Sequence, residues 1–190
     1  MQNKNSEKES MQNENEKLPV LVSACLLGVS CKYSGGHNYS EAVADLKEKY
    51  QLIPVCPEQM GGLMTPRVPA EVCSVKRRQM EKAGMSTVAA ETDLAAAEKG
   101  CIERRVVAKN GTDVTEQFQR GAQEALKLAK LFGCKCAVLK SRSPSCGSGI
   151  IYDGTFTGTK VAGDGITAAL LKENGIEVFS EEELHLFRKE

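Results

Sequence analysis

Short runs of apolar residues alternate with amphipathic segments along most of the chain. Four of these runs are largely apolar, contain β-branched residues and are bounded by turn-forming residues, which is typical of buried strands. They cover residues 19–24, 52–55, 136–140 and 176–179. Residues 71–76 and 105–108 are weaker strand candidates, and residues 150–156 predict a hairpin that turns at Asp153-Gly154.

The clearest helix is predicted over residues 115–132, where apolar side chains recur at three- and four-residue steps. These side chains are Phe118, Ala122, Ala125, Leu128, Ala129 and Phe132. Asp113 and Glu116 have the spacing of a capping pair at its start, and Gly133 is well placed to end it. Further helices are predicted over residues 40–50, 92–99, 166–174 and 180–187, the last of them capped by Ser180.

Strands that alternate with helices indicate a mostly parallel α/β sheet with helices on both faces. Residues 18–190 contain no internal repeat and no long linker, so we expect a single domain there. Residues 1–17 are almost entirely polar or charged. They cannot bury enough surface to offset the entropy of ordering, so we expect a disordered N-terminal tail.

Charge and hydropathy exclude two classes of partner. The 190 residues include 25 acidic and 25 basic side chains, so the formal net charge is zero. Phosphate binding is driven by a clustered excess of Lys and Arg, so we expect no nucleic-acid partner. The apolar stretches are far shorter than the ~20 residues of a membrane span, and no basic segment followed by an apolar one opens the chain. We therefore expect a cytoplasmic protein without a membrane partner.

Eight cysteines and only two histidines narrow the candidate chemistry. The cytosol is reducing, so the cysteines are not expected to form a disulfide framework. His37 and His185 share no motif, so any metal should be held by thiolates, which favour zinc or iron–sulfur clusters. Cys25, Cys56 and Cys146 each follow a predicted strand. Because ligands bind beyond the carboxyl ends of parallel strands, we expect these three thiols to converge.

Several common site motifs are absent from the sequence. There is no C-x-x-C pair, ferredoxin run, dinucleotide-binding glycine motif, phosphate loop or nucleophile elbow. The remaining cysteines apart from Cys31 are expected to be packing or surface thiols: Cys73, Cys101, Cys134 and Cys136. Asp164 is expected to shape the turn before the helix at 166–174, and the two histidines to lie at the surface.

The loops around the three cysteines resemble those of a known family. In order, the matching segments are SACLLGVSCKYSGG, VCPEQMGGLMTPR, KNGTDVTEQFQRGA, LKSRSPSCGSG and AGDGITAALLKENGIEV. They span roughly residues 18–183 and resemble the motifs of a bacterial family once known only as a domain of unknown function. Its characterised members are thiouracil desulfidases. The resemblance implies a single Rossmann-like α/β domain, in agreement with the predicted alternation of strands and helices.

The resemblance also implies a [4Fe-4S] cluster held by only three cysteines, which match Cys25, Cys56 and Cys146. The fourth iron is then open and accepts the sulfur of a thiolated nucleobase, acting as a Lewis acid. Such a reaction converts a 2-thiouracil-like pyrimidine into the oxo base and hydrogen sulfide without electron transfer. Glu58 matches the family's catalytic Glu, and Ser143 matches its catalytic Ser, so these two residues are the candidates for acid/base work.

Other interpretations of the same residues stay open. Cys31 lies in the same loop as Cys25 and is either a ligand in its place or a nearby thiol with a redox or sulfur-handling role. A labile cluster also suits an iron or oxygen sensor, and the same thiols suit a structural zinc, although closed zinc sites take four ligands. Lys140, Arg67 and the loop amides at Gly61-Gly62 are candidates to bind the pyrimidine.

Overall fold

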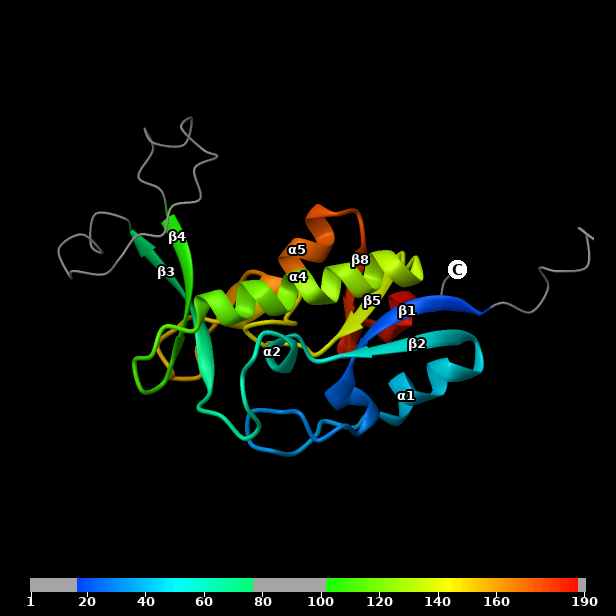
Figure 1. The fold of residues 1–190 in the computed structure, drawn as a ribbon, viewed down its shortest axis with the longest axis horizontal. Helices are drawn as coiled ribbons and strands as arrows, with labels where there is room; N and C mark the ends of the chain where they lie inside the picture. Colours follow the sequence, from blue (N-terminus) through cyan, green and yellow to red (C-terminus); the bar gives the residue numbers. More distant parts are fainter. Residues whose placement is uncertain (1–16, 77–101, 188–190) are drawn as a thin grey trace, which may run out of the picture.

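The structure is a computed structural model that describes residues 17–76 and 102–187 (Figure 1). Its central sheet consists of the parallel strands β1 (Leu18–Ser23), β2 (Tyr50–Val55), β5 (Cys136–Leu139) and β8 (Glu177–Ser180), in the order β2-β1-β5-β8. These are the four strands that the apolar runs predicted. The predicted tail lies outside the described residues except for its last residue, Lys17. The predicted helix at 92–99 also lies outside them.

Helices cover both faces of this sheet, as expected of a Rossmann-like domain. Figure 1 shows α4 (Thr115–Phe132) and α5 (Ile166–Glu173) on one side and α1 (Glu41–Ala44) on the other. Successive residues of β1 point to opposite faces. Leu21 packs in the core under α4 and α5, whereas Val20 and Val22 pack in the core with α1 and α6 (Leu184–Phe187). The double-sided burial explains why the strand is apolar at every position from Val20 to Val22.

The longest helix, α4, has the predicted bounds, but the predicted capping at its start is not formed. Gly133 ends it in the left-handed conformation, with a φ of 70°. The residue before its first turn is Val114, and no side chain caps the helix. The predicted capping pair is therefore wrong. Asp113 instead accepts the backbone N–H of Thr115 at 2.9 Å and pairs with Arg105 at 2.8 Å, so its carboxylate holds α4 against the neighbouring strand.

Two small antiparallel sheets lie beside the central one. β3 (Ala70–Lys76) pairs with β4 (Ile102–Ala108), as the weaker strand candidates predicted. β6 (Ile150–Tyr152) pairs with β7 (Lys160–Ala162), so the hairpin predicted over 150–156 turns later than expected. The Glu71 carboxylate explains this difference. It accepts the N–H groups of Gly154 and Phe156, both at 3.0 Å, and so holds that segment as a loop against β3.

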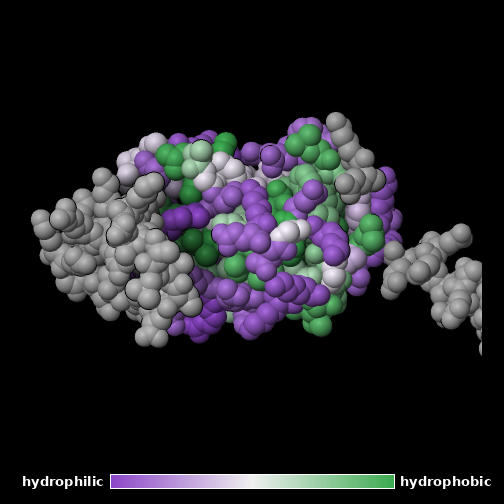
Figure 2. Space-filling view, turned by 90° about the horizontal axis from the view of Figure 1, so that it is seen from above, coloured by the Kyte–Doolittle hydropathy of each residue, from purple (hydrophilic) through white to green (hydrophobic). Residues whose placement is uncertain are grey.

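The remaining elements are short. The predicted helix at 40–50 divides into α1 and the 3-10 turn η2 (Asp45–Glu48), and the predicted C-terminal helix divides into η4 (Glu181–Glu183) and α6. Ser180 and Glu183 form a capping box at the start of η4. Seen from above, the molecule shows mostly hydrophilic side chains interspersed with small hydrophobic patches (Figure 2). In the part of the chain that the structure describes, no helix is long and apolar enough to span a bilayer.

Candidate functional site

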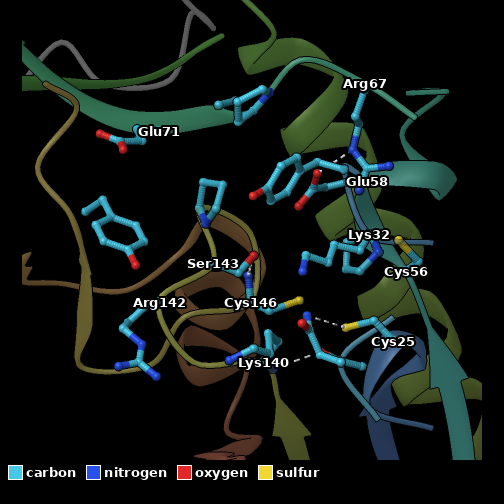
Figure 3. A pocket seen from close by; sticks show the side chains of 18 of the residues that line it. Cys25, Lys32, Cys56, Glu58, Arg67, Glu71, Lys140, Arg142, Ser143 and Cys146 are labelled. Atoms are coloured by element: carbon cyan, nitrogen blue, oxygen red, sulfur yellow. Dashed lines mark hydrogen bonds and ion pairs between the residues drawn. The ribbon is translucent and has the colours of Figure 1, made fainter. Parts of the chain in front are cut away.

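A cavity of about 570 Å³ lies beyond the carboxyl ends of β1, β2 and β5. The strand order changes direction between β1 and β5, and such a switch point is where open α/β sheets bind ligands. All five residues that the sequence singled out for chemistry line this cavity: Cys25, Cys56, Glu58, Ser143 and Cys146. Figure 3 shows that they come from three separate loops around one space.

Cys25 follows β1 in the 3-10 turn η1 (Ala24–Leu27), which Gly28 ends with a φ of 91°. The turn is anchored below by the buried side chain of Leu26. Asn38, in a loop farther along the chain, donates two hydrogen bonds to Cys25. Its backbone N–H donates to the Cys25 carbonyl oxygen at 2.9 Å, and its Nδ2 lies 3.8 Å from Cys25 Sγ. The position of this thiol therefore depends on a long-range contact as well as on its own turn.

Cys56 caps a four-residue helix, α2 (Pro57–Met60), that the sequence pattern did not predict. Pro57 at its first position has a backbone already suited to a helix start. The backbones of α2 and α4 pack very closely, with Gly61 against Gln117 and Gly121 against Pro57. A Cβ atom at Gly121 would lie only 1.8 Å from the carbonyl oxygen of Pro57. Two glycines thus allow α2 to present Cys56 and Glu58 to the cavity.

A salt bridge positions the Glu58 carboxylate. Arg67 Nε donates to Glu58 Oε2 at 2.7 Å, and both side chains are largely buried. Arg67 also donates to the carbonyl oxygen of Cys31 at 2.9 Å, so it connects two cysteine-bearing loops. Among the described residues, none donates a hydrogen bond to Glu58 Oε1, and the carboxylate faces the cavity (Figure 3). One oxygen is thus held in place while the other is available to a ligand.

Ser143 shapes the loop that carries Cys146. Its Oγ accepts the backbone N–H groups of Ser145 at 3.2 Å and of Cys146 at 3.1 Å, which is a serine turn. Both bonds use the Ser143 oxygen as an acceptor, so its hydroxyl proton is left for another partner. Cys146 itself is only 6% exposed. The preceding Arg142 has a left-handed backbone, with a φ of 60°, which turns the chain sharply into this loop.

Burial raises the pKa of Cys25, Cys31 and Cys146, which line this cavity. It raises the pKa of Cys25, which a hydrogen bond from Asn38 partly offsets, and it raises that of Cys146 far more strongly. The pKa of Cys31 rises to about 12, first through burial and then through the neighbouring Cys56. Three thiolates in this setting would be poorly solvated and would repel one another. They are therefore suited to a cationic centre that neutralises them.

The donor set fits a thiolate-bound metal cluster. The four cysteines that line the cavity form no disulfide in the described part of the chain, and neither described histidine lines it. Across residues 17–76 and 102–187, no group of three or more His, Cys, Asp or Glu is placed to hold a single metal ion. A cluster differs, because its cysteines ligate separate irons and need not surround one point.

The residues expected to bind a pyrimidine are only partly available. Arg67 lines the cavity, but its guanidinium is bound to Glu58 and to the Cys31 carbonyl. The backbone amides of Gly61 and Gly62 donate to carbonyl groups in their own turn at 2.8 and 2.9 Å, and neither glycine lines the cavity. The expectation that these two amides bind substrate is therefore wrong. Both are already used to close α2.

Lys140 lines the cavity as expected, but its ammonium group is paired with Glu181. The Glu181 carboxylate also accepts the backbone N–H of Ser141 at 2.6 Å. Burial alone would raise the pKa of Glu181, but the bonds from Lys140 and Ser141 outweigh it and hold this pKa below its ordinary value. The ion pair therefore joins the end of β5 to the start of η4 beside the cavity.

The other predicted structural residues lie away from the cavity. Cys134 is buried in the core under α4, and Cys73 is half-buried beside Gly154. Cys101 lies outside the described residues. Asp164 accepts the Gly149 N–H at 2.7 Å and shapes the turn before α5, as expected. The two histidines are exposed, also as expected.

Sequence reasoning missed two residues that approach the cysteines, Ser23 and Asn38. Ser23 ends β1 and is 2% exposed, and Asn38 contacts Cys25 from another loop. Both line the cavity. The one available signal was a polar residue, Ser23, within an otherwise apolar strand. No local pattern marks Asn38.

Comparisons with known proteins agree with the fold. Residues 20–183 match the family model described as 2-thiouracil desulfurase. The chain is 41% identical over 166 residues to the uncharacterized protein YbbK of Bacillus subtilis (strain 168), a match that covers 87% of this chain and 97% of YbbK. It is also similar to the solved structure of the [4Fe-4S]-dependent thiouracil desulfidase TudS, with 39% identity and a TM-score of 0.68. That match covers 90% of this chain and 95% of the solved one.

Proposed function

This chain belongs to the 2-thiouracil desulfurase family, and on that premise we propose that it removes sulfur from a thiolated pyrimidine such as 2-thiouracil. The thiocarbonyl carbon gains oxygen from water, and the sulfur leaves as hydrogen sulfide. Carbon and sulfur keep their oxidation states, so the reaction needs no electron donor or acceptor. A free thiolated nucleobase in the cytoplasm is the substrate class that we expect.

The proposed cofactor is a [4Fe-4S] cluster held by Cys25, Cys56 and Cys146. The similar desulfidase TudS is [4Fe-4S]-dependent, and these three thiols line one cavity on a matching fold. When bound by three cysteines, such a cluster offers an iron with an open position that acts as a Lewis acid toward a sulfur ligand. In this proposal Cys31 is a neighbour of Cys56 and not a ligand of the cluster.

Glu58 is the proposed general base. Arg67 Nε holds one carboxylate oxygen at 2.7 Å, and the carboxylate faces the cavity. An ionised carboxylate in that place accepts a proton from the attacking water and returns it to the departing sulfur. The Arg67 salt bridge also keeps the carboxylate from turning away when the cavity has no ligand.

Ser143 is the proposed hydroxyl donor to the substrate. Its oxygen is occupied by two backbone N–H groups, which orient the hydroxyl and leave its proton free. A donor fixed in this way stabilises negative charge that develops on a ring atom during attack by water. Ser143 therefore combines a loop-shaping role with a contact to the reacting ring.

One observation carries this proposal: three thiols from separate loops share a single cavity with a carboxylate, Glu58, that is anchored through only one oxygen. The test is anaerobic reconstitution of the full chain with iron and sulfide, followed by metal analysis and incubation with 2-thiouracil. We expect about four irons per chain and equal amounts of uracil and hydrogen sulfide. One zinc and no iron would exclude the cluster, and a cluster without turnover would favour the sensor.

Two cysteine variants provide a matched comparison for the ligand assignment. Cys146 and Cys134 are both buried, but only Cys146 lines the cavity. Cys146→Ala should abolish cluster retention, whereas Cys134→Ala should retain the full iron content. Equal loss of iron in both variants would show that general destabilisation, not ligation, is being measured.

A further inference from the structure

One neutral side chain donates a hydrogen bond to the sulfur atom of a proposed ligand: Asn38 Nδ2 reaches Cys25 Sγ. Asn38 is not itself a candidate ligand for iron, and it lines the cavity. It lies in the loop before α1.

Asn38 is held firmly enough to direct its side chain. Its backbone N–H donates to the Cys25 carbonyl oxygen at 2.9 Å, which fixes the main chain of the two residues together. Its Nδ2 lies 3.8 Å from Cys25 Sγ, a distance suitable for an N–H···S hydrogen bond. An amide N–H remains a donor whether the cysteine is a thiol or a metal-bound thiolate.

We propose that Asn38 is a positioning residue that hydrogen-bonds to the ligand sulfur of Cys25 and thereby sets the affinity and reduction potential of the cluster. This inference rests on the proposed function, since it requires a cluster at these thiols. Hydrogen bonds to cluster sulfurs are one of the means by which proteins tune iron–sulfur sites. Such donors withdraw charge from sulfur and favour the reduced, more negative cluster.

The test compares a donor variant with a control and a conservative variant in the reconstituted full chain. Asn38→Leu removes the donor to Cys25. The control Asn174→Ala removes an amide that bonds the Leu170 carbonyl, away from the ligand sulfurs. Asn38→Gln keeps an amide donor.

The main readout is the midpoint of one-electron reduction, from a dye-mediated titration followed by electron paramagnetic resonance. Asn38→Leu should shift the reduction equilibrium about tenfold toward the oxidised cluster, which corresponds to about 59 mV. Cluster loss to an anaerobic ferrous chelator should become about tenfold faster, as expected from one charge-assisted hydrogen bond. Asn174→Ala and Asn38→Gln should match the wild type in both measurements.

The outcomes separate this inference from the proposed function. An unchanged potential and chelation rate in Asn38→Leu, with a wild type that binds the cluster and releases hydrogen sulfide, would overturn the positioning role alone. Equal shifts in Asn38→Leu and Asn174→Ala would also overturn it, because a purely structural effect would then explain the result. A wild type that takes up no cluster would overturn both proposals. If Asn38→Leu does not fold, the smaller Asn38→Ala removes the same donor and decides the question.

Discussion

Replacing Gly121 by alanine tests how α2 is held at the cavity. A Cβ at this position would lie 1.8 Å from the carbonyl oxygen of Pro57 and 2.7 Å from its carbonyl carbon. Ordinary contacts between such atoms are about 3.5 Å, so the helices must separate by roughly 1.5 Å. The obstructing atoms belong to the backbone, so rotation of a side chain cannot relieve the clash.

The expected loss of stability follows from two opposing effects. Overpacking of this kind costs about 1–3 kcal/mol, and a backbone obstruction puts Gly121→Ala near the upper limit. Alanine recovers about 1 kcal/mol through its higher helix propensity. The net destabilisation is therefore about 2 kcal/mol, which for a chain of this length lowers the melting temperature by roughly 4–8 °C.

The expected loss of activity is larger than the loss of stability. Separation of the helices shifts α2, which carries Glu58 and follows directly after Cys56. A displacement of about 1 Å in a catalytic group costs on the order of 100-fold in rate. Turnover of 2-thiouracil, iron content and thermal unfolding should be measured on the same preparations. Hydrogen sulfide release should fall about 100-fold even at temperatures where the variant is fully folded.

Gln119→Ala is the matched control for this prediction. Gln119 is exposed on the same helix, so its replacement changes helix propensity without affecting the contact with α2. It should leave activity and iron content unchanged. If Gly121→Ala is as stable and as active as Gln119→Ala, the close approach between α2 and α4 does not position the site, and the reasoning is refuted.

Three further predictions concern single side chains around the cavity. Cys31→Ala should keep the iron content measured after reconstitution, whereas Cys56→Ala should lose it; the reverse result would exchange their roles. Glu58→Gln should keep the cluster and its absorbance but lose turnover by about 100-fold or more, and full activity would exclude Glu58 as the base. The lowered pKa of Glu181 stabilises the fold above about pH 4.3, the ordinary value of Glu, and this contribution disappears as the pH falls through the lowered pKa. Lys140→Met should therefore lower stability to denaturant by about 1–3 kcal/mol at pH 7, with a smaller difference from wild type at pH 3; a difference independent of pH would contradict this assignment.

The central sheet and the main helix were predictable because their signals are local. The inner strands β1 and β5 are buried on both faces over most of their length, so they are almost entirely apolar. Helix α4 has one buried face whose side chains recur at helical spacing. The convergence of Cys25, Cys56 and Cys146 followed from the same pattern. Each cysteine follows a strand, and parallel strands end at a common edge.

The errors occur where distant segments meet. α2 has only four residues and depends on the contact between Gly61 and Gly121, which no local pattern reveals. The turn expected at residues 153–154 is part of a longer loop. Glu71, far away in the sequence, accepts hydrogen bonds from two backbone N–H groups of this loop.

The order of apolar and polar residues was thus sufficient to predict the main helix, the strands of the central sheet and their parallel arrangement. It also predicted the edge of the sheet at which the cysteines lie. A strand that is buried on both faces needs apolar residues at consecutive positions, and such a run is visible in the sequence. The residues that contact the thiols could be identified only from the tertiary structure. The contacts of Asn38 with Cys25 are hydrogen bonds between segments that only folding brings together, and such bonds constrain single residues without any period.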